Sequence, residues 1–241
     1  MKPRRKLEHH GRQMELKVRI AAAPLRVYEA WAEPEKISQW FTDRTKGEAR
    51  PGATITWIFE KFGHETPYEV MDAAPGDRFA VGGRLPGRPP FLLEITLEQE
   101  GGETVVHLVN SGFLEGEGGD DEYEGVRSGW ALALELLKVY VERHFGEPKR
   151  TLLLLLQEAA FRFEDVLPLF TTAKGLEAWL ARTAELDGET LRLALREGGP
   201  VTGRRLLATS REAAFTWNEL PGILELKAFS MGPAGSGSAC V

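Results

Sequence analysis

The chain begins with two kinds of hydrophobic pattern, and their order predicts its first elements. Leu16, Val18 and Ile20 alternate with charged neighbours, as the residues of a half-buried strand do. Residues 27–41, VYEAWAEPEKISQWF, then carry apolar side chains at helical spacing before and after Pro34. Because proline ends one helix and is tolerated in the first turn of the next, we expect a strand followed by two short helices.

The segments that follow predict consecutive antiparallel strands and then one long helix. Turn signals near Pro51, Pro75 and Gly101 separate the strands, and loops this short cannot make parallel crossovers. Residues 120–145 then place a mostly apolar stripe on one helical face, made of Tyr123, Val126, Trp130, Ala133, Leu134, Leu137, Val141 and His144. This order predicts an α+β fold, in which a long C-terminal helix covers one face of a curved antiparallel sheet.

The helical segment near the N-terminus occurs a second time. Residues 166–180, VLPLFTTAKGLEAWL, align with residues 27–41 without a gap, so that Trp40 falls on Trp179. Strand-like segments follow this copy in the same order. We therefore predict a tandem repeat, with a disordered lead-in over residues 1–13, a first domain over 14–147 and a second over 150–241.

The second copy is predicted to be divergent and truncated. The sequence ends in GSGSACV, where the first copy still has a strand and its long helix to come. An antiparallel sheet tolerates solvent on one face only. The apolar residues expected to need cover on the other face are Leu191, Leu193, Leu195, Ile223 and Leu226. We expect that cover from the first domain or from a second chain, which makes a homo-oligomer one interpretation.

Composition narrows the class of protein. Hydrophobic residues make up 42% and charged residues 27% of the chain, as in folded globular proteins. A formal net charge of -6 gives no general attraction to nucleic acid, so no nucleic-acid partner is expected. The run TLLLLLQ is far shorter than the roughly 20 residues that span a membrane. With a single cysteine, Cys240, the chain is expected in the cytoplasm and away from membranes.

Three motifs carry a family resemblance. Residues 21–41, AAAPLRVYEAWAEPEKISQWF, are followed by VNSGF at 109–113 and by SGWALALELLKVYVE at 128–142. In this order they resemble the activator of heat-shock-protein-90 ATPase homologue family, part of the SRPBCC or START-like helix-grip superfamily. The resemblance covers about residues 14–146. It implies a helix-grip fold, and many START-like proteins hold apolar ligands between sheet and helix.

Strand alternation and the resemblance together suggest residues for such a ligand site. The candidate ligand-binding residues are Trp57, Phe59, Phe79, Leu93, Ile95, Leu108, Asn110, Trp130 and Leu134. The alternative interpretation is that these side chains fill a solid core. The family often has histidine at the position of Asn110, and asparagine cannot take up a proton near neutral pH.

No pattern in the sequence predicts catalysis, a metal or a cofactor. Spacing proposes no Ser-His-Asp arrangement, and the loop GGRLPGRPP lacks the Lys-Ser/Thr ending of a phosphate loop. The acidic residues before the long helix do not match a calcium loop and are interpreted as a solvated lead-in. No catalytic residue, metal ligand or cofactor is therefore proposed from the sequence.

Three functions remain open at this point. The first is a non-catalytic START-like protein that binds a small apolar or amphipathic molecule. The second is a co-chaperone-like interaction module with a chaperone partner, as the family name implies. The third is an enzyme of the polyketide cyclase type that uses the same space. The lack of catalytic signals favours the first.

Overall fold

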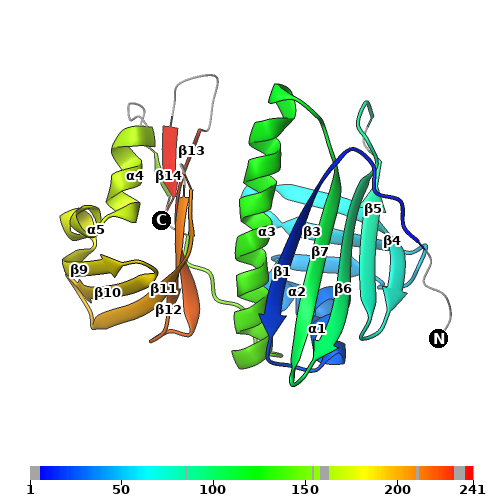
Figure 1. The fold of residues 1–241 in the computed structure, drawn as a ribbon, viewed down its shortest axis with the longest axis horizontal. Coiled ribbons are helices and arrows are strands. Elements are labelled where there is room, and N and C mark those ends of the chain that lie inside the picture. The colour runs from blue at the N-terminus through cyan, green and yellow to red at the C-terminus, as the bar shows by residue number, and fades with distance from the viewer. Residues whose placement is uncertain are drawn as a thin grey trace. The chain divides into compact units, whose positions relative to one another are not determined.

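The structure is a computed structural model that describes residues 6–84, 86–153, 155–157, 163–209, 212–230 and 237–240. The chain divides into two compact units, Met1–Lys149 and Arg150–Val241. Each unit holds one antiparallel sheet (Figure 1).

The first unit is a seven-stranded sheet with three helices and one short 3-10 turn. Its elements are β1 (Arg12–Ile20), α1 (Pro24–Ala32), α2 (Pro34–Trp40), β2 (Arg44–Gly47), β3 (Thr54–Phe59), η1 (Glu60–Phe62), β4 (His64–Ala74), β5 (Arg78–Gly83), β6 (Phe91–Glu100), β7 (Glu103–Phe113) and α3 (Glu117–Arg143). The strand order is β1-β7-β6-β5-β4-β3-β2. All strands pair antiparallel, as the short loops predicted.

The two short helices form where the sequence predicted them, and each starts with a proline. Pro24 and Pro34 occupy the first turns of α1 and α2, where the missing N–H group has no partner to lose. The buried faces of the two helices meet at Trp31 and Trp40, whose ring centroids lie 5.1 Å apart. Trp40 Nε1 donates to the backbone oxygen of Ala30 at 2.9 Å. This bond fixes the angle between the helices.

The long helix α3 covers the sheet and packs on β1, β7, α1 and α2 (Figure 1). The predicted stripe is buried over most of its length, with Leu137 and Val141 at 0% and 1% exposure. Trp130 is 8% exposed and lies between Trp31 and Trp57. This arrangement confirms the predicted α+β class and its helix-grip form.

The N-terminal segment differs from the lead-in that the sequence predicted as disordered over residues 1–13. β1 already begins at Arg12, and Leu7 is 8% exposed in a small cluster with Ala80 and Leu92. The backbone oxygen of His10 accepts from Gly112 at 2.9 Å. From Leu7 onward the segment therefore packs on the sheet. Because residues 1–13 are mostly polar and basic, the sequence did not show that Leu7 would be buried.

The second unit contains a sheet of the same strand order. Its elements are β8 (Leu155–Gln157), α4 (Phe163–Thr171), α5 (Ala173–Trp179), β9 (Ala181–Asp187), β10 (Thr190–Leu195), β11 (Pro200–Ala208), β12 (Glu212–Trp217), β13 (Gly222–Ser230) and β14 (Gly237–Cys240). The order β8-β14-β13-β12-β11-β10-β9 repeats, strand for strand, that of the first sheet.

The last strand of this sheet corrects one prediction. The segment GSGSACV was expected to end the second copy before its final strand, yet β14 pairs with both β13 and β8. Gly, Ser and Ala carry no hydrophobic alternation, so the sequence offered no strand signal there. Among the described residues of this unit, α4 and α5 are the helices that accompany the sheet.

The helix pair of the second unit makes the same contacts as that of the first. Trp179 Nε1 donates to the backbone oxygen of Leu169 at 3.1 Å, over the same ten-residue separation as the bond from Trp40 to Ala30. Phe170 meets Trp179 edge-on at 6.5 Å, as Trp31 meets Trp40. These contacts support the predicted tandem repeat.

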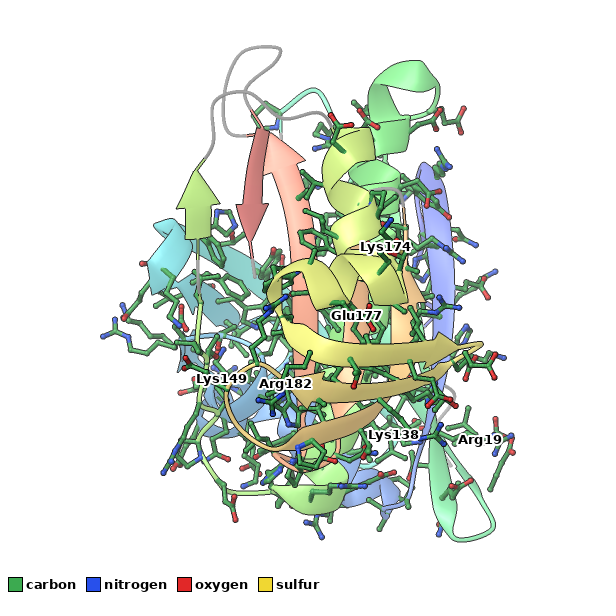
Figure 2. All side chains as sticks on the ribbon, turned by 90° about the vertical axis from the view of Figure 1, so that its left-hand side faces the viewer. Arg19, Lys138, Lys149, Lys174, Glu177 and Arg182 are labelled. Atoms are coloured by element: carbon green, nitrogen blue, oxygen red, sulfur yellow. The ribbon has the colours of Figure 1, made fainter. Side chains whose placement is uncertain are left out.

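The core of the second unit lies between α4, α5 and the sheet. Leu191, Leu193 and Leu226 are at most 3% exposed and cluster with Phe170 of α4. Figure 2 shows this side of the molecule, with Glu177 on α5 above the neighbouring strand β9. Glu177 Oε1 accepts there from the backbone N–H of Ala184 at 2.9 Å. The unit's own helices thus cover part of the apolar face.

The leucine-rich segment at the start of the second unit includes the short strand β8. β8 takes up Leu155–Gln157, while Leu152 is 82% and Leu153 37% exposed. None of the helices in the described parts of the chain combines the length and the apolar character needed to cross a membrane.

Candidate functional site

A pocket of about 190 Å³ lies in the first unit. Its wall is formed by the start of β4, the β5–β6 connection, the end of β7 and the N-terminal half of α3. The lining residues are Thr66, Pro67, Tyr68, Gly83, Arg84, Arg88, Pro89, Phe91, Asn110, Ser111, Gly112, Phe113, Glu122 and Val126. Apolar walls with a few converging polar groups are typical of small-molecule sites.

One glycine allows the pocket wall to close. Gly112 has φ +104, a conformation that side-chain-bearing residues rarely adopt, and a Cβ there would lie 2.8 Å from Phe91 Cα. Without a Cβ, the end of β7 can approach the start of β6 closely. Phe91 and Phe113 are thereby held on the same wall.

Aromatic rings form the apolar part of the pocket. The rings of Tyr68 and Phe91 lie 5.3 Å apart, and Phe113 is 5% exposed. Val126 of α3 also belongs to the lining. Burial raises the pKa of the Tyr68 phenol, so the hydroxyl stays protonated at neutral pH. Tyr68 can therefore donate a hydrogen bond in the pocket.

The charged part of the pocket comes from the β5–β6 connection and α3. Arg84 and Arg88 belong to the connection, and Glu122 belongs to the first half of α3. Arg88 Nη2 donates to Glu122 Oε2, and this contact raises the pKa of the guanidinium further. The guanidinium group of arginine is a cation with several N–H donors and no acceptor.

Asn110 is the predicted site residue that lines this pocket. Its side chain is fully buried and already has partners, because Oδ1 accepts from Trp130 Nε1 at 3.0 Å. Its Nδ2 donates to the backbone oxygens of Leu92 and Ser111, each at 3.2 Å. Asn110 thus links the sheet to α3, and both polar atoms of its side chain are engaged within the protein.

The other eight predicted residues are not among the lining residues of this pocket. They lie in or against the hydrophobic core instead: Trp57, Phe59, Phe79, Leu93, Ile95, Leu108, Trp130 and Leu134. Trp57 has a buried Nε1 with no hydrogen-bond partner among the described residues, and its ring lies 4.8 Å from that of Tyr68. The core and the pocket therefore meet at this pair of rings. A binding role for these eight residues stays a prediction.

Sequence reasoning missed most of the pocket. Tyr68 and Phe91 were expected only as members of strands, and the segment with Arg84 and Arg88 was interpreted as a loop without chemistry. The sequence signal for this part of the pocket was the pair Arg84 and Arg88 on either side of Pro86-Gly87. Glu122, the partner of Arg88, lies on a helix distant in the sequence, so spacing alone did not connect the two residues.

A second polar cluster, which shares Ser111 with the pocket lining, joins residues far apart in the chain. His9 Nδ1 lies 3.0 Å from Ser111 Oγ, and His9 Nε2 lies 2.9 Å from Glu94 Oε2. Arg78 Nη1 donates to Glu94 Oε1 at 3.2 Å, and Arg78 Nη2 donates to Asp72 Oδ2. The residue types resemble a nucleophile, base and acid. Ser111 is 1% exposed, and its contact with His9 ties the N-terminal segment to β7, so we interpret the cluster as an anchor of that segment.

Metal ligands do not gather in the part of the chain that the structure describes. It contains no group of three or more His, Cys, Asp or Glu side chains placed to hold an ion.

Comparison with known proteins gives one family match. Residues 21–142 match the family described as "Activator of Hsp90 ATPase homolog 1-like protein". No curated protein matches the chain.

Several solved structures are similar in fold. The solution structure of the Aha1 dimer from Colwellia psychrerythraea has 23% identity and a TM-score of 0.49, covering 56% of this chain and 98% of its own. Protein SSP2350 from Staphylococcus saprophyticus has 22% identity and a TM-score of 0.48, covering 58% of this chain and 98% of its own. DynU16, a putative protein in the dynemicin biosynthetic locus, has 20% identity and a TM-score of 0.49, with coverages of 95% and 85%.

Proposed function

The chain belongs to the activator of Hsp90 ATPase homolog 1-like family, and from this premise we propose that its first unit binds a small apolar or amphipathic molecule. The observation that carries the proposal is the pocket of about 190 Å³ between the sheet and α3. Its aromatic wall removes apolar surface of the ligand from water, and its polar groups orient the ligand.

The proposed role is binding without catalysis. General acid–base catalysis needs a group whose pKa lies near the working pH. Burial moves the pKa of Tyr68 upward, away from neutrality. Glu122 is engaged by Arg88, and the Asn110 amide is engaged by Trp130. A polyketide cyclase-type activity therefore has weaker support from these residues than ligand binding.

Filling the pocket tests the proposal. Val126 lines the pocket from α3, and Val126→Trp places an indole in the space that the ligand would occupy. The matched control is Val105→Trp on β7, where Val105 is partly exposed and outside the pocket lining. Ligand-observed NMR with p-cresol, a neutral single ring, should detect binding to the wild type and to Val105→Trp. It should detect none to Val126→Trp.

Two results would contradict the proposal. Failure of p-cresol to bind the wild type would remove its basis. Equal binding to Val126→Trp and wild type would place the ligand elsewhere, provided that circular dichroism shows both variants folded. Native mass spectrometry of protein purified from its source would then identify the bound species and the number of subunits.

The family also supplies the co-chaperone-like function as a second candidate. A surface observation that favours it is the side chain of Phe62, which is 70% exposed in η1 between β3 and β4. An exposed aromatic side chain is a frequent anchor in protein–protein contacts. Stimulation of a chaperone ATPase by the wild type, and its loss in Phe62→Ser, would support this function. A cytoplasmic location is part of both proposals, and cell fractionation tests it.

A further inference from the structure

The charged groups of the pocket suggest which class of ligand it takes. Arg84 follows β5 and Arg88 precedes β6, so one short connection brings both guanidinium groups to the pocket. Glu122 of α3 is the single acidic side chain among the lining residues. Two arginines and one glutamate leave one net positive charge, which a ligand with one negative charge would balance.

Arg88 has an incomplete set of hydrogen bonds. A guanidinium carries five N–H donors, and Nη2 is engaged by Glu122. Its Nε is buried and has no partner among the described residues. A buried donor without a partner is unfavourable, so an acceptor that reaches this atom is favoured. Carboxylates match the planar donor edge of arginine with two oxygens.

Arg84 is the more accessible of the two arginines. Its side chain is exposed, while Arg88 is partly buried and held by Glu122. An anion at Arg88 would therefore have a second cation within the same pocket lining, without the loss of an existing ion pair. Arg84 can also be substituted with little effect on folding, because it is exposed.

The size of the pocket limits the rest of the ligand. An apolar protein cavity of roughly 150 Å³ can hold a benzene molecule. The pocket has about 190 Å³, which leaves room for one ring and a small substituent. Tyr68 and Phe91 provide aromatic surface for that ring, since aromatic pairs favour tilted or offset contacts.

We infer that the pocket selects a single-ring aromatic carboxylate, with the carboxylate bound by Arg84 and Arg88 and the ring held against Tyr68 and Phe91. This inference rests on the proposed ligand binding and adds the charge and size of the ligand. The monoanion is favoured over a phosphate monoester because a second negative charge would face Glu122 without a balancing cation.

Isothermal titration of the full chain with benzoate and benzamide tests the inference. The two probes share the ring and differ in charge. Benzoate should bind the wild type about tenfold or more tightly than benzamide, the factor that a charge-assisted hydrogen bond supplies. Arg84→Ala should reduce that preference, because the affinity for benzoate falls more than the affinity for benzamide, whose neutral carbonyl oxygen accepts a weaker hydrogen bond. Arg127→Ala is the matched control, because Arg127 is exposed on α3 and outside the lining.

A second variant separates bidentate recognition from charge. Arg88→Lys keeps the positive charge and removes the donor fork, so the preference for benzoate should fall while phenyl phosphate gains nothing. Equal affinity of the wild type for benzoate and benzamide would overturn the inference and leave the proposed function standing. Tighter binding of phenyl phosphate than of benzoate would also overturn it. Failure of all probes to bind would overturn both.

Discussion

The two sheets of this protein share one strand order and differ in what covers them. In the first unit, α3 joins α1 and α2 over the sheet, and the core contains four tryptophans. In the described residues of the second unit, α4 and α5 accompany the sheet, and Trp179 and Trp217 are only partly buried. The same strand order thus supports two kinds of core.

The comparison shows which element creates the pocket. The sheet and the helix pair occur in both units, whereas Glu122 and Val126 come from α3. The sheet therefore forms one side of the pocket, and α3 forms the opposite side and contributes the negative charge of Glu122. The shared strand order is therefore no reason to assign the first unit's proposed binding function to the second unit.

The largest expected effect concerns the helix that distinguishes the units. Trp130→Ala removes ring contacts to Phe41 at 5.4 Å and Trp31 at 5.9 Å and leaves Asn110 Oδ1 without its donor. The free energy of unfolding should fall by about 3–5 kcal/mol, as for large aromatic truncations in cores. Urea unfolding followed by circular dichroism measures this. Trp179→Ala, in the less buried helix pair, should cost clearly less, and an equal loss would contradict the difference between the units.

A smaller loss of stability is expected from a substitution in the second helix pair, and it should have no counterpart at the aligned position of the first pair. A Cβ on Gly175 of α5 would lie 1.9 Å from the backbone oxygen of Pro168, so Gly175→Ala must push α4 and α5 apart. We expect a loss of about 1–3 kcal/mol, typical of overpacking. Lys36 occupies the aligned position of α2, where its side chain pairs with Glu33. Lys36→Ala should change thermal stability little, and a comparable loss there would show that the helix pairs pack alike after all.

The N-terminal segment is a further feature to test in the first unit. His9→Ala removes both ring contacts, to Ser111 and to Glu94, and should cost about 1–2 kcal/mol locally. Hydrogen exchange of the backbone amides at residues 6–11 should become faster. His10→Ala is the matched control, since the His10 side chain is 50% exposed. If both variants exchange alike, the polar cluster does not anchor the segment.

The smallest effect is a dependence on alkaline pH. Burial raises the pKa of Tyr68, so above its usual value of 10.0 the unfolded chain loses this proton before the folded protein does. The stabilisation is fully present below that pH and is lost as the pH rises through the raised pKa. Urea midpoints at pH of about 8 and about 11 should therefore fall less in Tyr68→Phe than in the wild type. An equal fall in both would mean that the phenol is not buried in the folded protein.

The parts of the fold that the sequence predicted are those with a strong local signal. The helix pair, its repeat at Trp179 and the stripe through Trp130 all follow from apolar spacing at 3.6 residues. The strand β14 has only small residues and gave no such signal. The anchoring of Leu7 depends on Ala80 and Leu92, which a reading along the chain does not bring together.

The pocket was harder to predict than the fold, and the reason is physical. Whether an apolar interior is filled or hollow depends on how side-chain volumes add up across elements, and a difference of one methylene group already matters. Trp57, Leu108 and Trp130, which were expected to line a cleft, belong to one buried core cluster, and their binding role stays a prediction. Arg88 meets Glu122 of α3, and the distance between these residues along the chain hides this contact from the sequence.

The contacts among the aromatic rings have a consequence for spectroscopy. Trp31, Trp40, Trp57 and Trp130 are linked by ring distances of 5.1 to 6.3 Å, close enough for excitation to pass from one indole to the next. Trp57 in turn touches Tyr68, whose ring forms part of the pocket wall. The intrinsic ultraviolet emission of the first unit therefore comes from one coupled group of chromophores with one end at the pocket. A guest bound beside Tyr68 would change the surroundings of this group, so a change in tryptophan emission is an expected spectroscopic sign of occupancy.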